Sequence, residues 1–174
     1  MIISVADVKK YINTDLDDTV LEAKLQALES MVRKYTNNNF QNRGIRYHCP
    51  IVAQKLYLSS TMLEVGDTVQ ISDSFYSNGV YTITEMDEDF IALNKALIGE
   101  PMVMVTKVEY PMDLKMGIVN MLKWDLENRD KVGIQSETIS RHSVTYFNMD
   151  GDNSDMGFPK SLLGFLKPYK KARF

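Results

Sequence analysis

Apolar residues recur at helical spacing through most of the first forty positions. A first helix is predicted over 5–12, because the Ser4 side chain can accept a hydrogen bond from a free N–H at the helix start. A second, longer helix is predicted to begin at Asp17–Asp18, whose carboxylates favour a helix N-terminus, and to end at Asn37–Asn39. Its apolar stripe consists of Leu21, Leu25, Leu28, Val32 and Tyr35.

Between 44 and 108 the spacing changes from helical to alternating. Asn78–Gly79 is a strong hairpin signal because both residues accept positive φ, and the acidic stretch Glu85–Asp89 predicts a second turn. Several short strands at this spacing are typical of a small barrel or rolled sheet. The clearest strand candidates are 56–58, 68–71, 80–84, 90–93 and 102–105.

Helical spacing returns after Pro111, although Gly117 costs about 1 kcal/mol inside a helix. Residues 137–147 alternate, which indicates a strand or an extended arm. Phe158–Pro159 then opens a short helix that we expect Pro168 to stop.

These elements predict an α+β fold. A small helical bundle core, residues 1–43 and 109–174, would carry an inserted small β-barrel-like domain, residues 44–108, and an extended C-terminal arm. We expect the first two helices and the helix after Pro111 to share one core, because none of them can bury its apolar stripe alone.

Composition and charge limit the classes of function that we expect for this chain. The 174 residues are 44% hydrophobic and 25% charged, as in ordinary globular proteins, and the net charge of -3 is unlike that of a general nucleic-acid binder. The start of the chain lacks a signal-peptide pattern, and no apolar run reaches bilayer length, so no membrane association is expected. We expect the protein to work in a reducing cytoplasm or in a particle assembled there.

Candidate metal sites are weak. Cys49 is the only cysteine, so a Cys-rich zinc cage is excluded, and its neighbour His48 is better interpreted as part of a strand edge. The loop Asp150–Asp155 begins like a calcium loop, but positions six and twelve hold Asp155 and Ser161 instead of glycine and glutamate. A solvated turn is the favoured interpretation, and no metal or cofactor is expected.

Candidate catalytic groups are equally weak, and we expect the protein not to be an enzyme. There is no phosphate-binding glycine loop and no GxSxG motif. His142 and Ser143 would point to opposite faces of a strand, although a hydrolase acting through His142 is one alternative. Glu85, Asp87, Glu88 and Asp89 are best interpreted as a solvated turn rather than a paired-carboxylate site.

The C-terminal region has a different character. Five basic and four aromatic residues follow Asp155 with no acidic residue among them, and arginine and aromatic side chains commonly anchor interfaces. Packing on the chain's own helices, or a solvated tail, would also explain the pattern. The residues are Lys160, Lys167, Lys170, Lys171, Arg173, Phe158, Phe165, Tyr169 and Phe174.

Both ends of the chain resemble the head–tail connector (adaptor, or head-completion) proteins of tailed bacteriophages. The resemblance rests on the stretch 5–12, the acidic break 15–18, the helix 19–35 with its ending Arg33–Asn37, and the terminal run 158–174. It covers roughly the first 40 and last 60 residues. The segment 44–108 departs from the compact members of the family.

The resemblance implies a homo-oligomeric ring, typically a dodecamer, bound beneath the portal protein at the capsid vertex. Such a ring would extend the DNA channel without binding DNA specifically and would offer a docking surface to a stopper or tail-completion protein. Carried over by position, the portal contact falls on Leu162, Phe165, Pro168, Tyr169, Lys170, Lys171, Arg173 and Phe174. A small nucleic-acid-binding or regulatory module, using the barrel and the basic tail, is the alternative.

Overall fold

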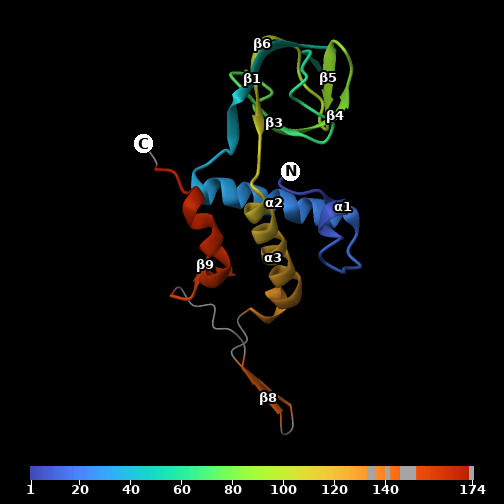
Figure 1. Ribbon diagram of the computed structural model, residues 1–174. Helices are drawn as coiled ribbons and strands as arrows, with labels where there is room; N and C mark the ends of the chain where they lie inside the picture. The colour runs from blue at the N-terminus through green and yellow to red at the C-terminus, as the bar shows by residue number, and fades with distance from the viewer. Residues whose placement is uncertain (133–135, 140–141, 146–151, 173–174) are drawn as a thin grey trace. The chain divides into compact units, whose positions relative to one another are not determined.

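The structure, a computed structural model, describes residues 1–132, 136–139, 142–145 and 152–172, which divide into two compact units (Figure 1). The barrel unit comprises Met1–Ile2 and Asn38–Tyr110, and the helical unit comprises Ile3–Asn37 and Pro111–Phe174. The barrel unit contains the whole of the predicted insertion, 44–108, with a few residues on either side. The N-terminal ammonium joins this unit by donating to Thr68 Oγ1 at 2.9 Å.

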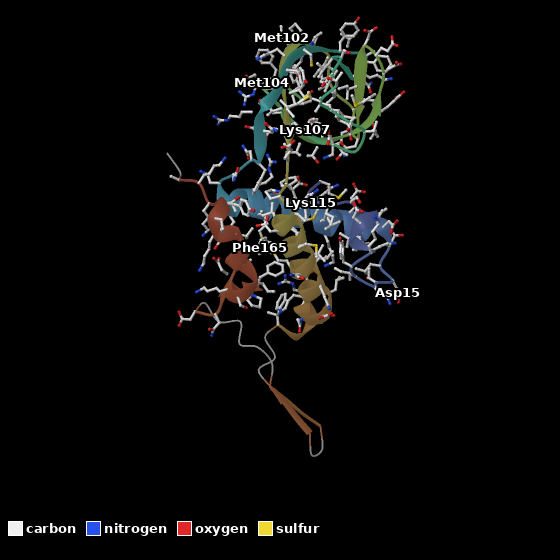
Figure 2. All side chains as sticks on the ribbon, viewed as in Figure 1. Asp15, Met102, Met104, Lys107, Lys115 and Phe165 are labelled. Carbon is white, nitrogen blue, oxygen red and sulfur yellow. The ribbon has the colours of Figure 1, made fainter. Side chains whose placement is uncertain are left out.

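The barrel unit is a closed barrel of six antiparallel strands, in the spatial order β1-β2-β5-β4-β3-β6, which confirms the predicted barrel. The strands are β1 (Gln41–Val52), β2 (Lys55–Tyr57), β3 (Thr68–Ser72), β4 (Gly79–Met86), β5 (Phe90–Leu93) and β6 (Glu100–Val108). Alternate side chains fill the interior, as Val103 and Val105 of β6 do, while Met102 and Met104 lie on the outside (Figure 2). The largest side chains that are fully buried in this core are Leu56, Ile71, Ile83 and Ile91.

Strand direction gives the barrel two distinct ends. Gln41 of β1 pairs with Val108 of β6, so the chain enters and leaves at one end, here called the base. The connections 58–67 and 87–89 also lie at the base, because β2 and β4 run towards it. The opposite end, here called the cap, carries the connections 53–54, 73–78 and 94–99.

The hairpin joining β3 and β4 exists, but the predicted tight turn at Asn78–Gly79 is wrong. Gly79 is already in β4, opposite Ile71, and the connection spans the six residues 73–78. Positive φ occurs instead at Asp73, at 57°. The Asn78 side chain stabilises the longer loop by bonding both the N–H and the carbonyl of Ser74, at 3.1 and 2.5 Å.

The helical unit contains three α-helices, two 3₁₀ helices and two small hairpins among its described residues. They are α1 (Val5–Val8), α2 (Asp18–Thr36), α3 (Met112–Asn128), η1 (Arg129–Lys131), β7 (Ser136–Ile139), β8 (His142–Thr145), β9 (Ser154–Asp155), β10 (Phe158–Pro159) and η2 (Lys160–Tyr169). The alternating segment 137–147 is thus partly a hairpin, with β7 paired to β8.

Capping at the helix ends follows the sequence closely. Ser4 Oγ accepts from the Asp7 N–H at 3.1 Å, and Asp17 Oδ1 accepts from the Thr19 N–H at 2.8 Å. Asn37 ends α2 in the left-handed conformation, with φ 49°. The first helix is shorter than predicted, because the chain tightens into i→i+3 turns after Val8.

Two predictions about the C-terminal region are wrong. Pro168 does not stop the last helix but lies within η2, since its fixed φ suits a helical turn and it forfeits only one N–H bond. The chain up to Ala172 is not an extended arm, because Tyr169 to Ala172 hydrogen-bond to the helical unit.

Candidate functional site

The C-terminal segment, defined here as residues 168–172, is attached to the start of α3 through Tyr169. The Tyr169 hydroxyl donates to the Asp113 carboxylate, whose two oxygens lie at 2.6 and 2.7 Å. This hydrogen bond raises the pKa of Tyr169, because the bond requires the protonated phenol. The side chain predicted to reach outward is therefore half-buried and bonded within its own unit.

The same segment also forms hydrogen bonds with the C-terminal end of α2. The Lys171 N–H donates to the carbonyl oxygen of Thr36 at 2.8 Å, and the Asn37 side-chain amide donates to the carbonyl oxygen of Ala172 at 2.8 Å. The last carbonyls of a helix lack partners within the helix, so the segment stabilises α2 as well as itself. Two elements, α2 and α3, thus fix the position of the segment.

Phe165 packs on its own chain rather than standing free. Its ring lies against Gly117 of α3 so closely that a Cβ at that position would overlap three ring atoms (Figure 2). Leu162 is half-buried beside Leu163 and Leu166, which are fully in the core. Both residues predicted to contact the portal therefore pack, at least in part, within the helical unit.

The exposed part of the predicted site is basic. Pro168, Lys170 and Lys171 are exposed, and Lys167 precedes them on the surface. The Lys170 ammonium lies 3.8 Å from the centroid of the Tyr35 ring, a favourable cation–π geometry. Arg173 and Phe174, also predicted as contact residues, lie outside the described residues.

A shallow hollow of about 620 Å³ lies on α2 beside this basic segment. It is lined by Ala27, Ser30, Met31, Lys34, Tyr35 and Met156. Tyr35 joins the hollow to the segment, since Lys170 covers its ring. Methionine and aromatic linings accept varied apolar side chains, so the surface combines an apolar recess with ammonium groups.

Arg129 fixes the start of the last helix. Its Nη1 donates to the carbonyl of Gly157 at 2.9 Å, and its guanidinium carbon lies 4.9 Å from the Phe158 ring centroid. Its Nη2 also pairs with Asp125 at 2.5 Å, and Lys24 of α2 reaches the same carboxylate at 2.7 Å. Burial raises the pKa of Asp125, but the hydrogen bonds and charges of Lys24 and Arg129 outweigh it and leave that pKa below its ordinary value.

The weaker candidate sites remain apart. Cys49 is buried in the barrel core, and burial raises the pKa of its thiol to about 11, whereas His48 faces outward. No group of three or more metal-ligating side chains comes together in the described part of the chain. The carbonyl oxygen of Asp152 accepts a hydrogen bond from the Lys160 ammonium at 2.7 Å. Asp150 and the side chain of His142 lie outside the described part of the structure.

A second exposed surface lies at the barrel cap and was not predicted from the sequence. Phe75 and Tyr76 are 86% and 71% exposed in the connection 73–78. Beneath them the buried carboxylate of Glu100 accepts from Ser74 Oγ at 2.5 Å and from the Phe75 and Tyr76 N–H groups at 2.8 and 3.3 Å. The Ser74 hydrogen bond, with the backbone donors, lowers the pKa of Glu100 against the opposing effect of burial. In the sequence, this surface was indicated by the two aromatic residues within the otherwise polar stretch 73–78.

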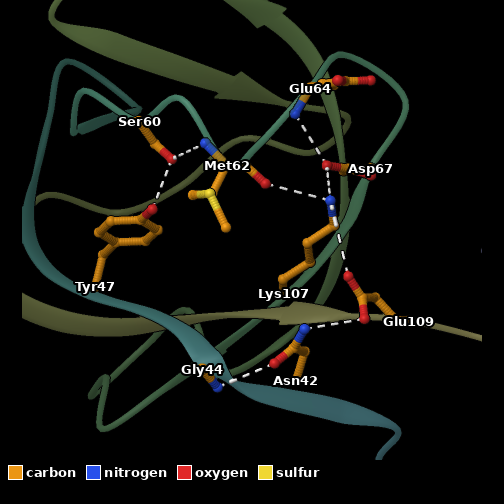
Figure 3. Close-up of polar contacts among 9 residues, drawn as sticks. All are labelled: Asn42, Gly44, Tyr47, Ser60, Met62, Glu64, Asp67, Lys107 and Glu109. Atoms are coloured by element: carbon orange, nitrogen blue, oxygen red, sulfur yellow. Dashed lines mark hydrogen bonds and ion pairs between the residues drawn. The ribbon is translucent and has the colours of Figure 1, made fainter.

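The barrel base carries a polar network instead (Figure 3). The Lys107 ammonium lies 2.8 Å from Asp67 Oδ2 and 3.2 Å from the Met62 carbonyl, so it closes the 58–67 connection. Glu109 accepts from the Asn42 side chain at 3.0 Å and lies 4.0 Å from Lys107. Because these polar side chains are paired with one another, we interpret the network as stabilising the fold rather than as a binding site.

A scan against models of protein families and a search of curated proteins both return no match for this chain. Among the described residues, no helix combines the length and the apolar character that a bilayer crossing requires.

Proposed function

We propose that this protein is a structural, non-enzymatic head–tail connector of a tailed bacteriophage. One observation carries the proposal: the two sequence segments that resemble that family, one at each end of the chain, fold together in the helical unit, although 73 residues of barrel unit separate Asn37 from Pro111. In this proposal the helices form a small bundle that packs side by side with neighbouring copies in a ring, typically dodecameric, beneath the portal. The ring extends the DNA channel and receives a stopper or tail-completion protein in the neck of the virion.

The portal contact is made by the basic face around the C-terminal segment. Lys167, Lys170 and Lys171 are exposed on backbone that is already held in place, so little conformational entropy is lost when a partner binds. The neighbouring hollow would receive an apolar side chain, and the ammonium groups would meet carboxylates. The segment acts as a fixed ridge rather than as a free tail.

Because the C-terminal segment is bonded to its own unit, charge reversal tests the portal contact better than deletion does. Deleting 168–174 would remove the portal contact but would also break the bonds to Asp113 and Thr36, and therefore confounds binding with folding. Charge reversal of Lys167 and Lys171 changes only exposed side chains. The matched control reverses Lys95 and Lys123, which are also exposed but lie outside this basic face.

The assay is co-sedimentation with the portal protein of the same phage. We expect the Lys167→Glu/Lys171→Glu variant to bind the portal at least tenfold more weakly, because it loses two charge pairs of about 1 kcal/mol each. The control variant should bind like the wild type. Equal portal binding by all three proteins would remove the basic face from the interface, and no binding by the wild type would remove the connector function itself.

The barrel's charge argues against the nucleic-acid alternative. Asn38–Tyr110 holds nine acidic and five basic residues, the opposite of the excess that phosphate contacts need. A gel-shift assay at low salt should therefore show no retained DNA.

A further inference from the structure

The barrel cap is an apolar surface built on a rigid support. Val52, Ile98 and Met102 are 56%, 56% and 57% exposed, and they add to the Phe75 and Tyr76 side chains. All five lie close to Glu100 in the fold. Glu100 pairs with Ile51, next to Val52, and binds the N–H groups of the aromatic loop, while the Ile98 N–H donates to Ser77 Oγ at 3.3 Å.

The support fixes the aromatic loop before any partner arrives. Ser74 Oγ accepts from the Ser77 N–H at 2.6 Å while donating to Glu100, and Tyr81 Oη donates to the Ser77 carbonyl at 2.9 Å. Among the described residues, no buried side-chain nitrogen or oxygen lacks a hydrogen-bond partner. A loop ordered in advance loses little entropy on binding, which is typical of an interface anchor.

The charges at the two barrel ends differ. The cap connections carry one exposed acidic residue, Asp73, and one exposed basic residue, Lys95. The base connections carry five acidic residues, namely Glu64, Asp67, Asp87, Glu88 and Asp89, and Glu109 follows β6 at the same end, whereas the basic Lys107 pairs with Asp67. Two bases would repel each other, whereas two caps can meet without like-charge repulsion.

The exposed area also decides what can cover the cap. At ~150–250 Å² for an aromatic side chain, the two rings and their three neighbours expose on the order of 500 Å² of side-chain surface. A specific interface needs at least about 1,000 Å² in total, so both sides must contribute a patch of this size. The other large apolar side chains exposed in the described residues are distributed over both units, namely Tyr11, Val20, Tyr57, Met62, Val65, Met112 and Val132.

We propose that the cap binds the cap of a second copy of this chain, through a two-fold contact centred on Phe75 and Tyr76. The contact is small, so the dimer is weak and reversible, with a Kd on the order of 10–100 μM. It uses the barrel alone and does not depend on the connector function.

Sedimentation equilibrium of the full chain tests the contact. The wild type should dimerise over the micromolar range, and Phe75→Ser/Tyr76→Ser should associate at least tenfold more weakly. Because both side chains are mostly exposed, the variant should keep the wild-type circular dichroism spectrum and melting temperature. The matched control, Met62→Ser/Val65→Ser, removes similar exposed surface at the base and should dimerise like the wild type.

Cross-linking tests the symmetry. Cys49 is buried, so Ile98→Cys introduces the single accessible thiol, and a two-fold contact brings two copies of it together. A short bis-maleimide should give dimers of Ile98→Cys and none of Val65→Cys.

A wild type that stays monomeric to about 1 mM, or a dimer unaffected by the Phe75→Ser/Tyr76→Ser change, would overturn the proposal. So would equal cross-linking at positions 98 and 65, which would indicate contact through no defined surface. Since no portal is present in these experiments, failure here leaves the connector function standing.

Discussion

Replacing Gly117 with alanine sets the helix preference of alanine against the packing of Phe165. Alanine favours a helix interior over glycine by about 1 kcal/mol. The added carbon would, however, overlap the Phe165 ring, whose Cδ2 would lie 2.5 Å away, compared with ~3.5–4.0 Å for ordinary contact. The ring would have to leave its site on α3.

The size of the loss follows from the burial of Phe165. Removing a fully buried phenylalanine costs about 3–5 kcal/mol, and this half-buried ring should contribute roughly half of that, about 2 kcal/mol. The net effect of Gly117→Ala is then a destabilisation of about 1 kcal/mol. In a Phe165→Ala background no ring is displaced, so the same substitution should stabilise by up to about 1 kcal/mol.

Urea unfolding followed by tryptophan fluorescence measures both values. Trp124 is the only tryptophan and lies in α3, 5.4 Å from the Phe158 ring, so its signal reports on the helical unit. The reversal of sign between the two backgrounds is the critical result. Stabilisation of the wild-type background by Gly117→Ala would refute the packing of Phe165 on α3.

Three further predictions concern titratable groups. Cys49, with its raised pKa of about 11 and 2% exposure, should resist Ellman's reagent at pH 8 in the native protein and react fully in urea; fast native labelling would contradict its burial. Tyr169→Phe should lower stability by about 1 kcal/mol and speed hydrogen exchange at the Lys171 amide, and unchanged exchange would show that the Asp113 bond does not hold the segment. Asp125→Asn should cost about 1 kcal/mol at pH 7. Because the folded pKa of Asp125 is lowered, its contribution is present above the ordinary value of 3.8 and is lost as pH falls through the folded value, so unfolding curves of variant and wild type should converge in acid.

Local signals in the sequence predicted much of the fold. The caps at Ser4, Asp17 and Asn37 require only neighbouring residues, so they could be identified directly. The alternation between 44 and 108 likewise predicted the barrel. The loop 73–78 could not be predicted, because its shape depends on Glu100, a residue distant in the sequence.

The candidate site shows the same division. The composition of the C-terminal region indicated interface residues, and the structure places Lys167, Lys170 and Lys171 at the surface. Its attachment was not predictable, since Asp113 is 56 residues from Tyr169 and nothing local indicates that bond. The role of Gly117 was misjudged for this reason too: its cost to the helix is local, whereas the space it provides serves Phe165.

Electron microscopy of this protein bound to its portal tests the central claim most directly. The account predicts a ring of copies beneath the portal, with Lys167, Lys170 and Lys171 of the helical unit at the contact. A complex in which the barrel touches the portal while these lysines face solvent would contradict the assigned surface. A wild-type protein that adds no density to the portal would contradict the connector function.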